Sequence, residues 1–240
     1  QASTGGGNCE LCNKQNDLPC SEYQCKSLGQ SCELINKGTN DEKCVWVNRN
    51  DVEFPIINPL DSALKTNYKY NPDNSISPPD RGVKIQYTPS TTKCVPAFTP
   101  FSFGVQLNEP AKCKLDITNK PDFEQMSFQF SSGLLKYNHT YSLSLPGTSA
   151  LQSENITVLN DGDYSIFVRC QDANGNKNTA NFVFNYCVEK GPDTTPPKIE
   201  RTSILNGDPV QFQVGSVNLD VFTNEPATCK WSGLDQSYEN

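Results

Sequence analysis

The residue types that most often carry out catalysis are sparse in this chain of 240 residues. The sequence contains one histidine, His139, which any Ser–His–Asp or Cys–His arrangement would have to use. His139 flanks a predicted strand, and we interpret it as structural. Gly-x-Ser-x-Gly, His-Glu-x-x-His and phosphate-binding loops are absent from the sequence. We therefore predict no enzyme and no cofactor; an unselected carboxylate pair and a catalytic domain outside these residues are the alternatives.

Alternating oxygen-bearing side chains at Asp172, Asn174 and Asn176 are residue types that Ca²⁺ takes as ligands. Gly175 lies within this run, however, and no glutamate follows at the position that a calcium loop requires. Asp and Asn side chains also bond frequently to the backbone of their own turns. We therefore predict that these residues stabilise a turn, and a calcium site is the alternative.

Cysteine is the most informative residue type, with eleven in the chain. Six lie before residue 50, in a segment with too few apolar residues for a packed core of its own. We predict that these six form disulfides, and the sequence does not choose among their connectivities. Zinc is the alternative because Cys9-x2-Cys12 has ligand-type spacing, although no matching pair accompanies it. The six are Cys9, Cys12, Cys20, Cys25, Cys32 and Cys44.

The net charge of −7 argues against nucleic acid as a partner, because phosphate binding requires a basic face. No apolar run approaches the roughly 18 residues that a membrane-spanning helix needs, so we expect no membrane span. The cysteine content is typical of an oxidising compartment. N-glycosylation sequences at Asn138 and Asn155 agree with it. The expected location is extracellular, at the cell surface.

The elements that would position these residues are strands. Tyr164, Ile166, Val168 and Cys170 alternate with Ser165, Phe167 and Arg169. A period of two places the first four residues on one face of a strand. Asn174-Gly175 is typical of a type I′ hairpin turn, and a second alternating segment follows and ends at Cys187. This hairpin looks like the F–G corner of an immunoglobulin-like (Ig-like) sandwich. No segment has a convincing helical period, so the predicted fold class is all-β.

Four regions follow from composition and spacing. Residues 1–50 form a disulfide-stapled, cysteine-rich module, and residues 51–80 form a Pro-rich connector that we expect to be extended. Residues 81–190 read as one Ig-like β-sandwich. Residues 194–240 begin a second Ig-like repeat, which is either incomplete here or donated to a neighbouring subunit.

An internal repeat supports the tandem arrangement. Asn108-Glu-Pro-Ala-Lys-Cys113-Lys recurs as Asn224-Glu-Pro-Ala-Thr-Cys229-Lys, which is a shift of 116 residues. Cys113 and Cys170 lie on strands that we expect to be neighbours, so we predict that they pair. Cys94 precedes one strand and Cys187 ends the last, which predicts a second disulfide. Cys229 copies Cys113, so its partner lies beyond residue 240 or in another molecule.

These motifs carry a resemblance. Glu-Pro-Ala-x-Cys, Tyr-x-Ile-x-Val-Arg-Cys-x-Asp-x-x-Gly-Asn and Asp-Thr-Thr-Pro-Pro look like Ig-like repeats of large secreted cell-surface proteins of archaea. The segment from Ser21 to Asn36 also resembles a cysteine-rich module of such proteins. The resemblance implies a surface or appendage protein and no reaction. It departs from antibody domains, because Tyr164 lies six residues before Cys170 rather than two.

The functional expectation is an extracellular structural protein that self-associates into a filament, appendage or surface layer. The alternative is a surface adhesin whose partner is a cell-surface glycan or protein. Aromatic residues in and near the connector, including Phe54, Tyr68 and Tyr70, are candidate interface anchors. For Trp46 and Trp231 we favour structural roles: Trp46 caps the cysteine-rich module and Trp231 fills the core of the second sandwich.

Overall fold

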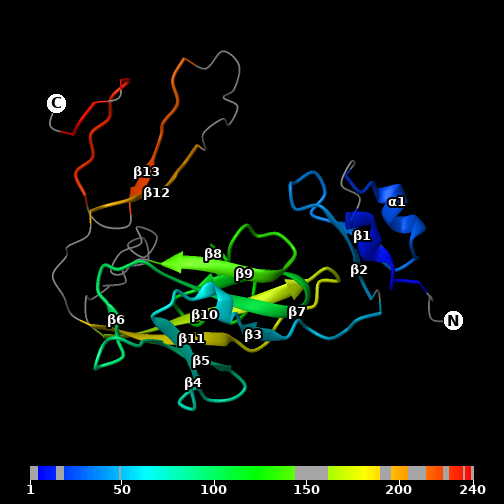
Figure 1. Ribbon diagram of the computed structural model, residues 1–240, viewed down its shortest axis with the longest axis horizontal. Coiled ribbons are helices and arrows are strands. Elements are labelled where there is room, and N and C mark those ends of the chain that lie inside the picture. Colours follow the sequence, from blue (N-terminus) through cyan, green and yellow to red (C-terminus); the bar gives the residue numbers. More distant parts are fainter. Residues whose placement is uncertain are drawn as a thin grey trace. The chain divides into compact units, whose positions relative to one another are not determined.

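The computed structural model describes residues 5–14, 19–48, 50–143, 162–189, 196–204, 215–223, 227–234 and 236–238. It is rich in strands (Figure 1). Its residues divide into two compact units. The first unit contains Gln1–Thr88, Ser102–Tyr141 and Tyr164–Tyr186, and the second contains Pro89–Phe101, Ser142–Asp163 and Cys187–Asn240. Among the described residues, no helix has the length and apolar character to cross a membrane.

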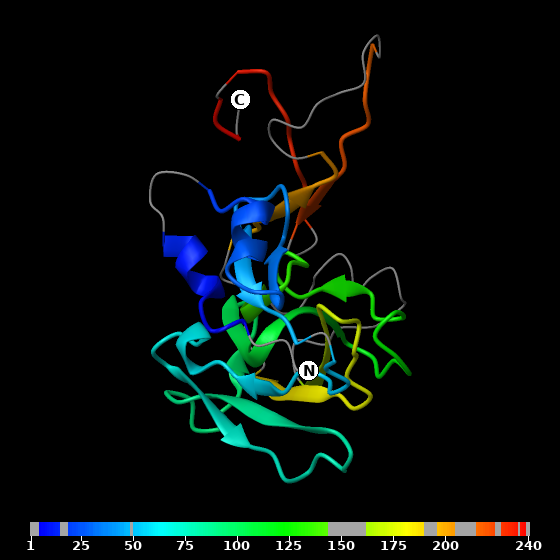
Figure 2. The same cartoon turned by 90° about the vertical axis from the view of Figure 1, so that its right-hand side faces the viewer.

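The cysteine-rich segment begins the first unit. Two short helices, η1 (Cys9–Lys14) and α1 (Glu22–Ser27), contact a hairpin of β1 (Cys32–Ile35) and β2 (Lys43–Trp46), as Figures 1 and 2 show. Helix α1 begins at a capping box, in which Ser21 and Gln24 each satisfy a backbone N–H of the other. The interior of the cysteine-rich segment consists almost entirely of half-cystines and Leu34, so disulfides take the place of a larger apolar core.

A nine-stranded sheet forms the sandwich in the described residues, with the order β3-β7-β10-β11-β5-β4. Strand β6 pairs with β11, and both β8 and β9 pair with β7. The bounds are β3 Ile57–Pro59, β4 Tyr68–Pro72, β5 Arg81–Tyr87, β6 Val95–Pro96, β7 Phe101–Asp116, β8 Phe128–Gln129, β9 Lys136–Leu143, β10 Gly162–Asp172 and β11 Phe182–Glu189, with a short helix η2 at Asp61–Ala63.

Strand β7 lies at the centre of this arrangement. Its alternating residues Phe101, Phe103, Val105 and Leu107 are at most 4 % exposed. The sequence predicts two strands here, separated by the Glu109–Pro110 step, but the structure has one strand of 16 residues. Proline is tolerated because the pairing of β7 with β3 ends at Leu107 and its pairing with β10 begins at Ala111, so neither needs the missing donor at Pro110.

Two strands come from the stretch between residues 51 and 80. Ile57 in β3 lies opposite Leu107 in β7, and Tyr68 in β4 lies opposite Tyr87 in β5. The Tyr70 hydroxyl accepts a hydrogen bond of 2.9 Å from the backbone N–H of Gly104, which anchors β4 to the sandwich. The first unit therefore draws part of its sheet from the stretch that we expected to be a connector.

Strands β10 and β11 are neighbours, as the alternation predicts, but their turn differs from the expected type I′ turn. In the loop, Gly175 has a positive φ of 95° and Asn174 does not. The backbone N–H of Gly175 bonds to the carbonyl oxygen of Asp172, and the Asp172 carboxylate accepts from Asn176. An aspartate at the start and a glycine at the fourth position instead favour an ordinary turn within a longer loop.

The second unit includes a two-stranded sheet of β12 (Ile199–Thr202) and β13 (Val221–Thr223). Residues 217, 219 and 221 align with buried positions of β7 at the repeat shift, yet Val217, Leu219 and Val221 are about half exposed. Trp231 is 94 % exposed, so its predicted place in a core is wrong for the described residues. The predicted strand at 156–159 and the repeated Asn224-Glu-Pro lie outside the described residues.

Candidate functional site

Three carboxylates from distant parts of the chain come together in the first unit. Asp51 follows the cysteine-rich segment, Glu109 lies on β7, and Asp172 ends β10. One oxygen of each lies within 4.8 Å of the others. Asp172 is 4 % exposed and the other two are half-buried. Carboxylate oxygens at such separations are the donor set of a hard cation, although acidic groups also cluster without one.

Burial and the neighbouring carboxylates shift the pKa of Glu109. Burial, together with the negative charges of Asp172 and Asp51, raises the pKa of its carboxyl to about 7. Each of these effects disfavours the charged form of the group. Near neutral pH the side chain therefore exchanges a proton, so it both donates and accepts hydrogen bonds. A half-buried carboxyl with a shifted pKa in a cleft is a characteristic of functional sites.

The run Asp172, Asn174 and Asn176 does not gather around a common point as a calcium loop would. Asn176 donates to both carboxylate oxygens of Asp172, at 2.7 Å through its backbone and 2.8 Å through its amide. The Asn174 amide instead donates to the carbonyl oxygen of Asn48, at 2.7 Å. The structure thus uses these residues for turn bonds and for hydrogen bonds to Asn48 and Asp51. It also brings Asp172 to Asp51 and Glu109.

A cavity of about 140 Å³ lies beside this cluster. Its walls include Asp51 and Glu109, and two aromatic side chains, Trp46 from β2 and Tyr137 from β9. Trp46 is 53 % exposed and Tyr137 is 44 % exposed. Trp46 packs against Gly6 of the cysteine-rich segment on one side. It remains half exposed, so it is not a buried cap of that segment.

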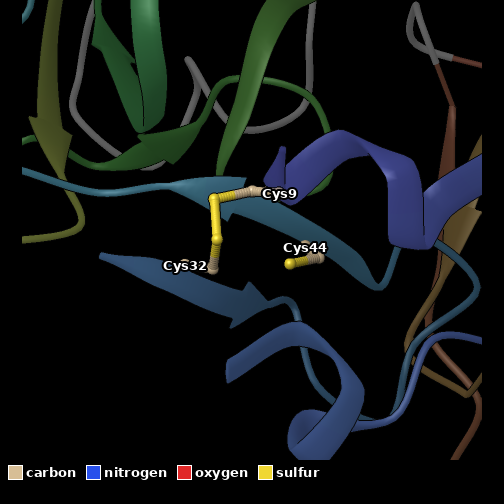
Figure 3. Close-up of side chains that lie close together, drawn as sticks. All are labelled: Cys9, Cys32 and Cys44. Carbon is tan, nitrogen blue, oxygen red and sulfur yellow. A yellow bond between two sulfur atoms is a disulfide. The ribbon is translucent and has the colours of Figure 1, made fainter. Parts of the chain in front are cut away.

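All six cysteines of the N-terminal segment form disulfides in the structure. Cys9 pairs with Cys32, Cys12 with Cys20, and Cys25 with Cys44. Figure 3 shows the Cys9–Cys32 disulfide with Cys44 beside it. The sulfur atoms of these three residues lie within 4.8 Å of one another, a grouping that a metal site also has. Because each sulfur is in a disulfide, none is a thiolate, and the zinc alternative does not fit.

The sandwich contains the two disulfides that the repeat suggested. Cys113 and Cys170 are directly opposite each other in β7 and β10, and Cys94 pairs with Cys187. Cys229 is a free and exposed thiol among the described residues. A disulfide between Cys229 and a cysteine beyond residue 240 or in another molecule stays a prediction.

The predicted glycosylation site at Asn138 lies on β9, where the asparagine and Thr140 are exposed and His139 between them is fully buried. The glycan acceptor therefore faces away from the core. Asn155 lies outside the described residues. The exposed placement of Asn138 is compatible with modification, and its occupancy stays a prediction.

Sequence reasoning missed Asp51 and Glu109 as a pair, and it missed Tyr137. Glu109 belongs to the repeated Asn-Glu-Pro-Ala-x-Cys motif, which marked the position without indicating its neighbours. Asp51 reaches the cluster because Asn176 donates to its carbonyl oxygen, at 2.9 Å. Long-range contacts of this kind leave no local periodicity in the sequence.

No protein-family model, curated protein sequence or solved structure matches this chain.

Proposed function

We propose that this chain is an extracellular structural segment of a cell-surface protein, assembled from tandem Ig-like modules into a filament, appendage or surface layer. Its mechanism is mechanical: disulfides limit how far each module can be extended. The observation that supports the proposal is the nesting of two disulfides. Cys94–Cys187 joins residues 93 apart, and Cys113–Cys170 joins residues 57 apart within that segment.

Pulling on a chain extends only the residues that lie outside closed loops. Between Cys94 and Cys187 the force passes through the disulfide, so the strands that lie between them bear none of it. In the cysteine-rich segment, Cys9–Cys32 and Cys25–Cys44 overlap along the sequence, so most of that segment is protected in the same way. An oxidising, extracellular location is required for this role, because the cytosol would reduce the disulfides.

Single-molecule force spectroscopy on the native protein, held near its two ends, tests this role. Reduction should lengthen the fully stretched chain by about 300–330 Å from the 93-residue Cys94–Cys187 loop alone. The Cys94→Ala/Cys187→Ala variant should gain length without reductant, but less, because Cys113–Cys170 still closes its own loop. Equal stretched lengths before and after reduction would contradict the mechanical role.

Self-association is tested separately by electron microscopy of the non-reduced protein across a range of concentrations. Regular fibres or sheets are the expected result. Isolated particles at every concentration would exclude a homopolymer and would favour the second candidate, a surface adhesin. That candidate is supported by a specific observation, the two half-exposed aromatic side chains that line one cavity in the first unit.

A further inference from the structure

Two cavities of the first unit lie next to each other, and we name them together the groove. They measure about 350 and 140 Å³, and Pro110 and Tyr137 belong to the walls of both. Residues of the β1–β2 hairpin line one side, and residues of β7 and β9 line the other. Tyr137 therefore stands between two neighbouring compartments, which is the arrangement expected for a ligand built of linked units.

The smaller compartment presents two aromatic rings, and one of them rests on the backbone. A Cβ atom on Gly6 would lie 1.9 Å from Cδ1 of Trp46, so the indole rests directly on the Gly6 backbone. Trp46 as a whole is 53 % exposed. Tyr137 is 44 % exposed, and burial of the rest raises the pKa of its hydroxyl, which stays protonated. An exposed ring that is fixed from behind, as Trp46 is, offers contact area at low entropic cost.

Polar side chains around the rings are fixed as well. The Asn108 side-chain oxygen accepts from the backbone N–H of Ile56 at 2.7 Å, and the Asn174 amide donates to the carbonyl oxygen of Asn48 at 2.7 Å. At the larger compartment, Asn36 makes two hydrogen bonds of 2.9 Å with the backbone of Leu135. These bonds tie the two walls together, so the groove is formed before any ligand arrives.

The charges select against two ligand classes. Among the described residues that line the smaller compartment there is no lysine, arginine or histidine, and two are carboxylic acids, so an anion would be repelled. In the larger compartment Lys136 pairs with Asp41 at 2.8 Å, and the wall also contains Lys43, so the selection against anions belongs to the smaller compartment. Amide and carboxyl groups interleaved with rings also make the groove too polar for a purely apolar ligand.

We propose that this groove binds a neutral carbohydrate chain, with Trp46 and Tyr137 as stacking platforms for successive sugar units. A pyranose presents an apolar face of C–H groups, which suits the negative face of an aromatic ring, and a rim of hydroxyls. The hydroxyls both donate and accept, which suits Asn108, Asn174 and Glu109. This site goes beyond the load-bearing role and gives the adhesin candidate its ligand class.

Tryptophan fluorescence measures the binding directly, since the chain has two tryptophans. In a Trp231→Phe background, Trp46 is the remaining tryptophan, and Trp231 itself is exposed and lies outside the groove. The probes are the neutral disaccharides maltose, cellobiose, lactose and chitobiose at millimolar concentrations, followed by a glycan array. We expect saturable quenching or a blue shift with at least one of them, and no response to glucuronate.

Two substitutions from opposite walls locate the site. In the Trp231→Phe background, Tyr137→Ala should weaken the disaccharide at least tenfold by fluorescence. Trp46→Ala, whose background retains Trp231, should abolish retention on the corresponding immobilised glycan. Tyr23→Ala is the matched control, because Tyr23 is 84 % exposed and lies outside the groove. If Trp46→Ala fails to fold, Tyr137→Ala still decides the question, since Tyr137 is half exposed on β9.

Three results would overturn the proposal. The first is an absence of response to every disaccharide and to the array. The second is binding that survives Tyr137→Ala unchanged. The third is a saturable response of Trp46 to tetramethylammonium or Ca²⁺ and to no sugar, which would assign the site to a cation. The force-spectroscopy experiment does not depend on any of these three results. A failure of the carbohydrate proposal would therefore leave the proposed mechanical role untouched.

Discussion

The Nε2 atom of His139 lies 2.8 Å from the carbonyl oxygen of Ala111 on β7, and the whole imidazole is buried. Nδ1 has no hydrogen-bond partner among the described residues. This arrangement requires a neutral ring whose proton is on Nε2, because a proton on Nδ1 would be a buried donor without an acceptor. The ring also packs edge-to-face against Phe130, at 6.2 Å between centroids.

The first prediction is a loss of stability in mild acid. Burial lowers the pKa of His139 below its usual value; hydrogen bonds to backbone carbonyl oxygens oppose this shift, and the positive charge of Lys136 adds to it. His139 in the unfolded chain therefore binds a proton near pH 6.5, whereas His139 in the folded protein stays neutral at that pH. The free energy of unfolding is at its full value above that pH and falls as the pH drops below it. Urea denaturation between pH 5 and 7.5 measures this. The variant His139→Leu should lose that part of the dependence; an unchanged slope would show that other groups cause it.

The second prediction has the opposite sign and concerns Glu109. Its pKa is raised to about 7 in the folded protein, above the value of the unfolded chain. Its contribution is therefore favourable below pH 4.5 and is lost as pH rises through about 7. Glu109→Gln carries a neutral amide at every pH and should raise the melting temperature at pH 8 more than at pH 5.

Glu22→Gln is the control for this comparison. Glu22 is exposed, and a hydrogen bond from Lys37 lowers its pKa, so the amide should give no gain in stability at pH 8. Equal effects of the two substitutions would indicate a general response to reduced negative charge, because the chain carries a net charge of −7.

The parts of the fold that could be predicted from the sequence are those whose signal is local. Alternation predicted β10 and β11 because both have one buried face. The pairing of Cys113 with Cys170 followed from expecting those strands to be neighbours, and they lie directly opposite each other. Tyr141 and Leu143 alternate and predict a strand from Tyr141 onward, whereas β9 begins at Lys136, because its buried polar residue His139 hides the alternation.

Features that depend on distant neighbours could not be predicted. Strands β3 and β4 are short and Pro-containing, and they become strands because β7 and β5 offer them edges. The candidate site has the same origin: Trp46 and Tyr137 are 91 positions apart in the sequence, and packing of two segments brings them to one cavity. A second Ig-like repeat stays a prediction, since residues 224–226 lie outside the described residues.

A third prediction concerns the disulfides. Removing the Cys113–Cys170 cross-link with Cys113→Ala/Cys170→Ala opens a loop of 57 residues and should cost about 4 kcal/mol of unfolding free energy. Cys12–Cys20 spans 8 residues, and its removal should cost about 2.5 kcal/mol. Urea denaturation of both double variants measures the difference. A larger cost for the short loop would contradict an explanation based on chain entropy and point to lost packing.

The last prediction concerns a close backbone approach between two strands of the sheet. Gly82 on β5 lies opposite Val183 on β11 in a parallel pair, and a Cβ atom at Gly82 would lie 1.9 Å from the Val183 carbonyl oxygen. Backbone atoms cannot move aside as a flexible side chain can, so Gly82→Ala must separate the two strands. We expect a loss of about 3 kcal/mol or more in unfolding free energy.

Gly7→Ala is the control. A Cβ at Gly7 meets nothing within 4 Å, so this substitution should change the free energy of unfolding by less than about 0.5 kcal/mol. Equal effects of the two substitutions in urea denaturation would mean that β5 and β11 do not approach so closely.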